Sequence, residues 1–171
     1  MILSRRSVLR IGGGLLAALP LASSRVWSAE AVDIIMSGNA DGSKVWFDPI
    51  GLVVQPGQTI RWTNKDPGNA HTSTAYHPDN DAHPLRIPQG AQSWNSDYLL
   101  PDQSFSVVLT EPGIYDYFCV PHEHAGMVGR IIVAGGAQPI PAPSSGGIPD
   151  VAEKAFPSVE DIIREGRVDA R

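Results

Sequence analysis

Seven short segments rich in β-branched and aromatic residues alternate with turn-forming residues, and this pattern limits the fold more than any other feature. The segments are Val32–Met36, Lys44–Phe47, Leu52–Val54, Thr59–Asn64, Ser104–Thr110, Ile114–Cys119 and Gly129–Val133. Turn residues such as Pro56-Gly57, Asp66-Pro67-Gly68 and Glu111-Pro112-Gly113 separate them. Several short strands punctuated in this way are typical of an all-β sandwich or barrel.

Alternation within these segments indicates strands that are buried on one face. Ile60, Trp62 and Asn64 share one side of the fourth segment, and the residues between them share the other. The stretch from His77 to Leu99 has no such alternation and contains three X-Pro pairs. We expect it to be a long loop that crosses from one sheet to the other.

The chain has a single cysteine, and its neighbours give that cysteine a chemical context. Cys119, His122 and Met127 occur in the order Cys-x2-His-x4-Met, after one expected strand and before the next. One thiolate and two imidazoles in a trigonal set, with a weak axial methionine, are the ligands of an electron-transfer copper site. This loop supplies three of those four groups, and His71 is the first candidate for the fourth. The sequence therefore predicts one type 1 copper ion.

Two other interpretations of the cysteine loop explain less. Structural zinc sites take four cysteine or histidine ligands, and methionine is a poor ligand for zinc. A buried, inert Cys119 with Met127 in the core and His122 on the surface leaves the coincidence of three ligand types unexplained. Copper accounts for all three side chains.

The remaining loop histidines are His77, His83 and His124. Exposed loop histidines are most often solvated. The alternative is a second, weaker metal site, because Asp79 and Asp81 lie close to the first two in the sequence. His124 lies on the ligand loop, two residues after His122, where its charge would tune the redox potential or the docking of a partner.

The first 29 residues are typical of an export signal. Arg5 and Arg6 precede a weakly apolar run from Ile11 to Ala22, which resembles a twin-arginine signal. The run is far shorter than the roughly 20 apolar residues of a membrane span, so we expect no stable membrane insertion. An uncleaved N-terminal anchor is the alternative. We expect a periplasmic or otherwise exported protein.

Removal of residues 1–29 leaves a strongly acidic chain. It takes away four of the 13 basic residues and none of the 18 acidic ones, so nine basic side chains remain and the formal net charge is −9. This balance argues against a nucleic acid partner, because such binding rests on basic side chains that neutralise phosphates. It favours solubility and docking to a basic protein.

We predict three parts of the chain: an export signal over 1–29, one β-domain over 30–135 and a tail over 136–171. The stretch from Ala137 to Pro149 is rich in Pro, Gly and Ser, as a linker is. Ser158 then begins a capping pattern for a short amphipathic helix. Two alternatives remain open for this flexible tail: the helix docks on the domain or on a partner, or it frays.

Three stretches resemble the plastocyanin and halocyanin branch of the small blue copper proteins, the cupredoxins. They are Phe47–Pro49 with Val53–Asn64, then Asn69–His71, then Leu109–Cys119 continuing through Met127–Val133. The resemblance spans roughly residues 32–134. It implies an eight-stranded Greek-key β-sandwich. It also implies that copper is bound by His71, Cys119, His122 and Met127.

Two positions depart from the family pattern. An asparagine commonly follows the first histidine ligand and steadies the loop that carries the cysteine, whereas this chain has Thr72. We expect the backbone N–H of Thr72 still to reach the sulfur. Plant plastocyanins use a tyrosine immediately before the cysteine as a remote electron port; here Phe118 stands in its place, so that port is not carried over.

The function that follows is a monomeric, one-electron carrier between redox proteins. An enzyme needs an open metal position or a second copper centre, and this chain shows one complete set of four ligands. We therefore expect no catalytic residues and no organic cofactor. A copper-binding or copper-delivery protein of the cell envelope is the alternative, and the loop histidines are its support.

Overall fold

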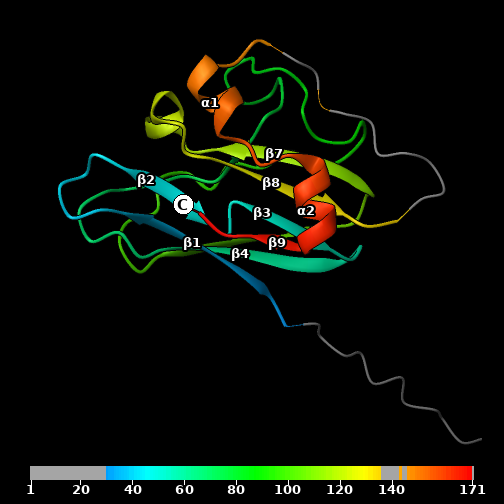
Figure 1. The fold of residues 1–171 in the computed structure, drawn as a ribbon, viewed down its shortest axis with the longest axis horizontal. Helices are drawn as coiled ribbons and strands as arrows, with labels where there is room; N and C mark the ends of the chain where they lie inside the picture. The colour runs from blue at the N-terminus through cyan, green and yellow to red at the C-terminus, as the bar shows by residue number, and fades with distance from the viewer. Residues whose placement is uncertain (1–29, 136–142, 144–145, 171) are drawn as a thin grey trace, which may run out of the picture.

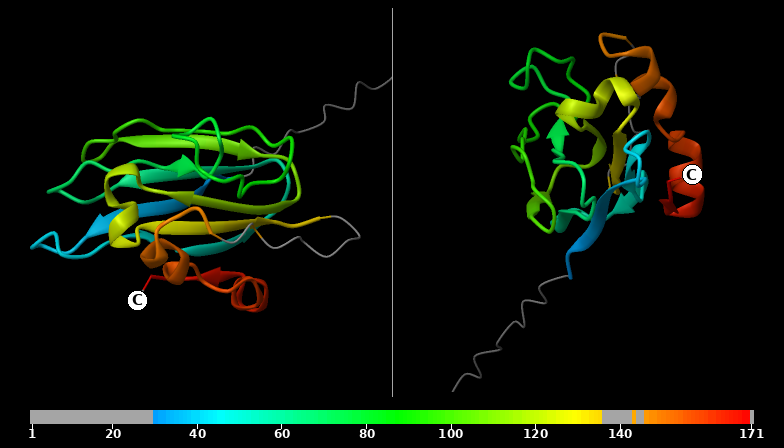
Figure 2. Two further views of the ribbon diagram at one scale, coloured as in Figure 1. Left: turned by 90° about the horizontal axis from the view of Figure 1, so that it is seen from above. Right: turned by 90° about the vertical axis from the view of Figure 1, so that its left-hand side faces the viewer.

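The computed structural model describes residues 30–135, 143 and 146–170, and it has two β-sheets packed face to face (Figures 1 and 2). The expected export signal and most of the expected linker lie outside the described residues. The prediction of an all-β sandwich is confirmed.

The first sheet has four strands in the order β2-β1-β4-β6. Their bounds are Val32–Gly38 for β1, Val45–Asp48 for β2, Gln58–Asn64 for β4 and Ser104–Leu109 for β6. β1 and β4 run parallel, with Ile34 opposite Trp62, and the other two pairings are antiparallel. Between β2 and β4 the chain visits the second sheet, so neighbours in space are not neighbours in sequence.

The second sheet has five strands in the order β5-β7-β8-β3-β9. Their bounds are Gly51–Val54 for β3, Thr74–Ala75 for β5, Gly113–Phe118 for β7, Val128–Val133 for β8 and Arg167–Val168 for β9. β7 and β8 form an antiparallel hairpin in which Phe118 lies opposite Val128. This hairpin carries the cysteine loop at its tip.

All seven strands expected from the sequence are present in the described residues. β5 and β9 were not expected, because strands of two residues carry no alternation that a sequence could reveal. β9 brings the described strands to nine, one more than the resemblance implies.

Side chains from both sheets fill the space between them. In β4, Ile60, Trp62 and Asn64 are buried and Arg61 is exposed, as the alternation predicts. Trp62 contacts Tyr117 of β7 edge-to-face, with ring centroids 5.3 Å apart. Each fully buried large apolar side chain contributes about 1.5–3 kcal/mol to stability. The cysteine and methionine of the ligand loop belong to this same buried cluster, so the candidate site is continuous with the core.

Two short helices follow the sandwich: α1, Asp150–Ala155, and α2, Val159–Glu165. Both lie on the outer side of β7 and β8 (Figures 1 and 2). Ser158 caps α2, because its hydroxyl accepts a hydrogen bond from the backbone N–H of Asp161 at 3.0 Å. The sequence predicts this helix but not α1, whose N-cap, Pro149, has no side-chain acceptor.

The helices cover apolar side chains on the outer face of the second sheet. Ile162 of α2 packs with Ile114 and Ile132, and Ala152 of α1 packs with Phe118. The described part of the tail therefore docks on the domain, which decides between the two alternatives. This coverage explains why all six residues of β7 and all six of β8 are buried.

A buried charge network holds α1 against this face. Asp116 of β7 accepts hydrogen bonds from Nε of Arg130 at 2.7 Å and from Nε of Arg86 at 3.0 Å. Glu153 of α1 accepts from Nη1 of Arg86 at 2.6 Å. Phe156 lies against both guanidinium groups, with its ring centroid 5.1 Å from Cζ of Arg86 and 4.8 Å from Cζ of Arg130.

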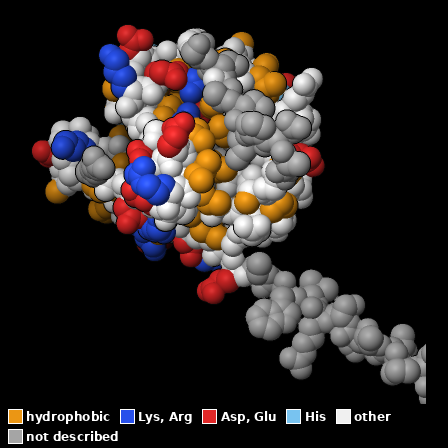
Figure 3. All heavy atoms as spheres, turned by 45° about the vertical axis from the view of Figure 1, so that its right-hand side comes forward, with side chains coloured by type: hydrophobic (Ala, Val, Ile, Leu, Met, Phe, Trp, Pro, Cys, Tyr) orange, Lys and Arg blue, Asp and Glu red, His pale blue; other side chains and the backbone are white. Residues whose placement is uncertain are grey.

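Charged side chains on the surface form exposed pairs, in contrast to the network around Asp116. On the face drawn in Figure 3, acidic and basic side chains lie next to one another at the surface. Arg61 and Asp33, for example, form an ion pair at 2.6 Å in which both side chains are exposed. Exposed pairs of this kind contribute little to stability, because water screens them.

We expect Asp116→Asn to lower the free energy of unfolding by about 3–5 kcal/mol, because it removes the carboxylate that two buried arginines share. Urea denaturation of the metal-free protein measures this change. Asp33→Asn is the matched control, since it breaks an exposed pair, and it should destabilise the protein far less. Equal losses in the two variants would contradict the structural role given to the buried network.

Candidate metal centre

The cysteine loop is closed by its own backbone. Cys119 follows β7 and caps a 3-10 helix over Val120–Ala125. Its N–H donates to the carbonyl of Met127 at 3.0 Å, and its carbonyl accepts from the N–H of His122 at 3.0 Å. The N–H of Met127 in turn donates to the carbonyl of His122 at 3.1 Å. Gly126 has a φ of 81°, the left-handed conformation that lets the chain turn back into β8.

His71 reaches the same place from a different segment of the chain. It lies between β4 and β5 and forms a two-bond antiparallel bridge with Leu99. The His71 N–H donates to the Leu99 carbonyl at 3.1 Å, and the Leu99 N–H donates back at 2.8 Å. His71 is fully buried, so its ring has little freedom to move away.

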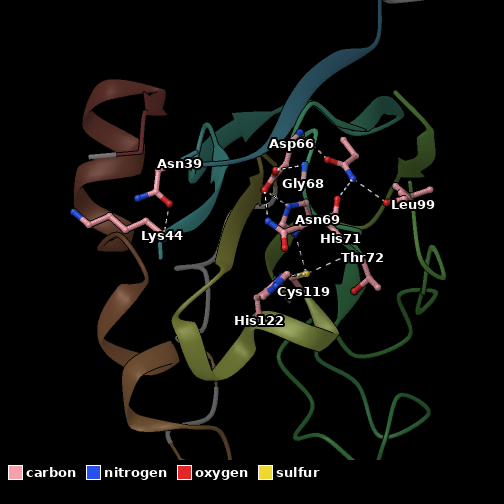
Figure 4. Close-up of polar contacts among 11 residues, drawn as sticks. Asn39, Lys44, Asp66, Gly68, Asn69, His71, Thr72, Leu99, Cys119 and His122 are labelled. Atoms are coloured by element: carbon pink, nitrogen blue, oxygen red, sulfur yellow. Dashed lines mark hydrogen bonds and ion pairs between the residues drawn. The ribbon is translucent and has the colours of Figure 1, made fainter. Parts of the chain in front are cut away.

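The structure brings the donor atoms of His71, Cys119 and His122 within 4.8 Å of one another. Nδ1 of His71 is 3.6 Å from the Cys119 sulfur, and Nδ1 of His122 is 3.4 Å from it (Figure 4). Metal bonds of about 2.3 Å to a thiolate and about 2.0 Å to an imidazole separate such atoms by about 3.5–3.7 Å. These residues thus fit a metal ion placed among them. Met127 is fully buried on the same loop, and its role as the axial ligand stays a prediction.

The protonation of these groups also suits a metal. Burial raises the pKa of the Cys119 thiol to about 11, and the hydrogen bond from the N–H of Thr72 only partly offsets that effect. Burial lowers the pKa of His71, although Asp66 opposes it, and burial lowers the pKa of His122 too. Both imidazoles are therefore neutral at pH 7, which is the form that binds metal. The thiol proton must leave when a metal binds.

Asp66 lies behind His71, and the sequence had shown it only as a turn residue. Its Oδ2 is 3.1 Å from Nε2 of His71, the ring nitrogen that faces away from the cysteine (Figure 4). Burial raises the pKa of Asp66, but hydrogen bonds from Asn69, Gly68 and His71 outweigh this and leave the pKa below its ordinary value. Asp66 is thus a buried carboxylate in contact with a candidate ligand.

Thr72 steadies the cysteine loop, as the family's asparagine was expected to do. Its backbone N–H donates to the sulfur of Cys119 at 3.3 Å, which confirms that this contact survives the substitution. Its side-chain hydroxyl accepts a hydrogen bond from the N–H of Val120 at 2.8 Å. One residue therefore ties the first histidine's segment to the loop at two points.

A second group of side chains braces the loop from the side of α1. The rings of Phe118, Tyr76 and His83 pack against one another. The Phe118 centroid is 4.5 Å from each of the other two, which are 5.4 Å apart. The hydroxyl of Tyr76 donates to Oε1 of Glu123 at 2.8 Å, and Nε2 of His83 is 3.3 Å from Oε2 of the same carboxylate. Glu123 is part of the loop and nearly buried. Sequence reasoning missed this contact, because these residues are far apart in the chain.

Within the part of the chain that the structure describes, His77, His83 and His124 do not belong to a group of three metal-ligating side chains. Nδ1 of His77 is 3.3 Å from Asp79, and His83 pairs with Glu123. Among residues 30–135 and 146–170, one group of His, Cys, Asp or Glu side chains is close enough to share a metal ion, and it is the group around Cys119.

We expect Thr72→Val to lower the free energy of unfolding of the metal-free protein by about 1–3 kcal/mol, because it leaves the Val120 N–H buried without an acceptor. Chemical denaturation measures the loss. Thr63→Val is the control, since its hydroxyl bonds to Ser104 on an exposed face, and it should have a smaller effect. An unchanged stability in Thr72→Val would show that the hydroxyl does not hold the loop.

Comparison with known proteins points to one family. The model of the copper-binding proteins of the plastocyanin/azurin family matches residues 34–134. A chloroplastic plastocyanin from Chlamydomonas reinhardtii is 36% identical over 118 residues, which are 68% of this chain and 78% of that protein. The plastocyanin of Sambucus nigra is 37% identical over 101 residues, 58% of this chain and 97% of that protein.

A solved structure supports the same fold. The pseudoazurin from Sinorhizobium meliloti superposes with a TM-score of 0.50 at 26% identity, over 78% of this chain and 98% of that one. The sequence resemblance, the sandwich and the donor set thus agree with one another.

Proposed function

Because the chain belongs to the plastocyanin/azurin family of copper-binding proteins, we propose that it works as an exported one-electron carrier with a single copper ion. The proposed ligands are His71, Cys119, His122 and Met127. The observation that carries the proposal is the group of one sulfur and two imidazole nitrogens within 4.8 Å of one another.

The chemistry of these donors fits copper in both oxidation states. A thiolate favours Cu(I), imidazole suits Cu(I) and Cu(II), and a distant thioether is acceptable to both. Bound copper would supply one-electron redox chemistry at this position. The chain is a copper electron carrier and not an enzyme, in keeping with its plastocyanin relatives.

The contribution of the protein is to keep the donors still. His71 is fixed by its bridge to Leu99, and Cys119 is fixed by backbone bonds within the loop and by Thr72. Side chains held in this way are already arranged as the ligands require, so little has to move when an electron arrives or leaves. Slow rearrangement around the site is thereby avoided.

His122 is the proposed ligand that a redox partner can approach most closely. Its side chain is half-buried, whereas His71 and Cys119 are fully buried. Pro121 and Ala125 flank it and are exposed. A redox protein that docks over this apolar rim approaches the imidazole edge closely and leaves quickly, as small transient interfaces allow. A net charge of −9 after removal of the signal favours a partner with a basic surface.

We further propose that residues 1–29 are a twin-arginine export signal, that 30–135 form the copper domain and that 136–171 form a linker and tail. The paired arginines and the short apolar run support export to the periplasm or an equivalent compartment. No helix among the described residues is long and apolar enough to cross a membrane. We propose that the carrier acts as a monomer.

Absorption and EPR spectra of the copper-loaded protein test this function. We expect an intense visible band from thiolate-to-copper charge transfer, and we expect Cys119→Ser to abolish it because the sulfur is lost. A colourless copper protein that passes its metal to an acceptor would contradict electron transfer and would favour a role in copper delivery.

Met127→Leu tests the axial position separately. The thioether is a weak donor to Cu(II), so its removal should raise the reduction potential while copper and colour are kept. Voltammetry of the two proteins measures the shift. Complete loss of copper from the variant would show that Met127 does more than weak axial ligation.

A further inference from the structure

The carboxylate behind His71 is an unusual group to find in this core. Asp66 is 3% exposed, and its Oδ2 is 3.1 Å from Nε2 of His71. The other fully buried aspartate, Asp116, is neutralised by two arginines. The ion pairs of the described part of the chain give Asp66 no lysine or arginine and place only the imidazole of His71 opposite it. Burying a charge is costly unless it is paired or hydrogen-bonded, so the groups around this carboxylate decide whether it stays charged.

The surroundings of Asp66 hold it in one position as an acceptor. The N–H of Gly68 donates to Oδ1 at 2.9 Å, and Nδ2 of Asn69 donates to Oδ2 at 2.9 Å. The N–H of Asp66 itself donates to Oδ1 of Asn64 at 2.8 Å. The Gly68 N–H and Nδ2 of Asn69 both donate to this carboxyl group, and two such hydrogen bonds favour its ionised form.

The same network also fixes the backbone on both sides of His71. Nδ2 of the buried Asn64 donates to the carbonyl of Asn69 at 2.8 Å and to the carbonyl of Leu99 at 2.9 Å. Leu99 is the residue that bridges His71. The imidazole and its carboxylate partner are thus located by one continuous set of hydrogen bonds.

This arrangement selects one tautomer of His71. An ionised carboxylate only accepts, so the hydrogen of the neutral imidazole must be on Nε2. Nδ1 then carries the free electron pair, and Nδ1 is the atom that faces the Cys119 sulfur at 3.6 Å. A histidine that donates to a carboxylate is also a more basic ligand.

We propose that Asp66 is a positioning residue of the copper site, an inference that rests on the proposed function. Its carboxylate holds His71 with Nδ1 free toward Cys119, and its negative charge favours the more positive, oxidised state of the site. Asp66 thus lowers the reduction potential from a place where it does not touch the metal.

A substitution at Gly38 is a second, independent way to disturb the Asp66 carboxylate. A Cβ atom added at Gly38 would lie 2.3 Å from Oδ2 of Asp66, too close for both atoms to stay. Because Oδ2 is the end of a side chain, Gly38→Ala should displace the carboxylate from His71 without removing its charge. This variant separates the hydrogen bond from the charge.

The first test is the potential of Asp66→Asn. Asparagine keeps the size and an acceptor oxygen but loses the charge. At a fixed applied potential we expect the ratio of reduced to oxidised protein to rise at least tenfold, equivalent to about 59 mV for one electron. Asp41→Asn is the matched control, because Asp41 lies beside the same surface hollow as Asp66 and is exposed. A shift no larger than that of the control would overturn the proposal.

The second test needs no copper. Nitrogen-15 NMR of the metal-free protein should show the His71 hydrogen on Nε2, and Gly38→Ala should make this signal broaden or move to Nδ1. A hydrogen on Nδ1 in the unaltered protein, or a Gly38→Ala spectrum identical to it, would contradict the proposal. This readout stays decisive if Asp66→Asn does not fold. If the copper-loaded protein lacked the thiolate band, the proposed function would fail while the tautomer still reported on Asp66.

Discussion

The fixed placement of His71 beside Cys119 is the constraint on which the rest of the structure depends. The two residues are 48 positions apart in the chain and belong to different segments of the sandwich. Backbone bonds hold each of them: the bridge to Leu99 on one side and the closed loop to Met127 on the other. Thr72 joins the two segments directly through its N–H and its hydroxyl. The donors are therefore together because the fold is formed, and the metal completes a site that the chain has prepared.

Burial shifts the pKa values at this site in two directions, upward for the thiol and downward for the imidazoles, and both shifts favour a metal. The desolvated Cys119 resists losing its proton to water, and the desolvated His71 and His122 resist gaining one. A soft cation can replace the thiol proton of Cys119 and can bind the two neutral imidazoles, so the same burial favours metal binding at all three side chains. Bracing from outside the sandwich completes the arrangement: α1 packs on Gly126, where an added Cβ atom would lie 3.4 Å from Val151 and 3.5 Å from Ala155.

Much of the fold and the centre of the site follow from the sequence. The strands with clear alternation were all found, and Cys119 and His122 are local enough in sequence to suggest a site by spacing alone. The helices of the tail were harder to predict from the sequence, since α1 begins without a capping side chain. Asp116 and Arg130 are charged residues within two strands, and nothing in the sequence nearby shows that they are buried beside Arg86 and Phe156. Contacts between residues that are tens of positions apart in the chain leave no pattern in the local sequence.

The same limit applies to the surroundings of the site. Asp66 stands in an Asp-Pro-Gly stretch that sequence reasoning assigns to a turn. Its contact with His71 follows from the path of the loop and from the absence of a side chain at Gly38. His83 is similar, because its place against Phe118 and Glu123 depends on how the long loop folds back. Ligand types are visible in a sequence, whereas the groups that orient them become visible in the fold.

X-ray absorption spectroscopy of the copper-loaded protein in both oxidation states tests the central claim most directly. A site fixed by the fold predicts one short sulfur bond and two nitrogen neighbours in each state, with bond lengths that barely change on reduction. Loss of a nitrogen neighbour on reduction, or a different donor set in the two states, would contradict the account.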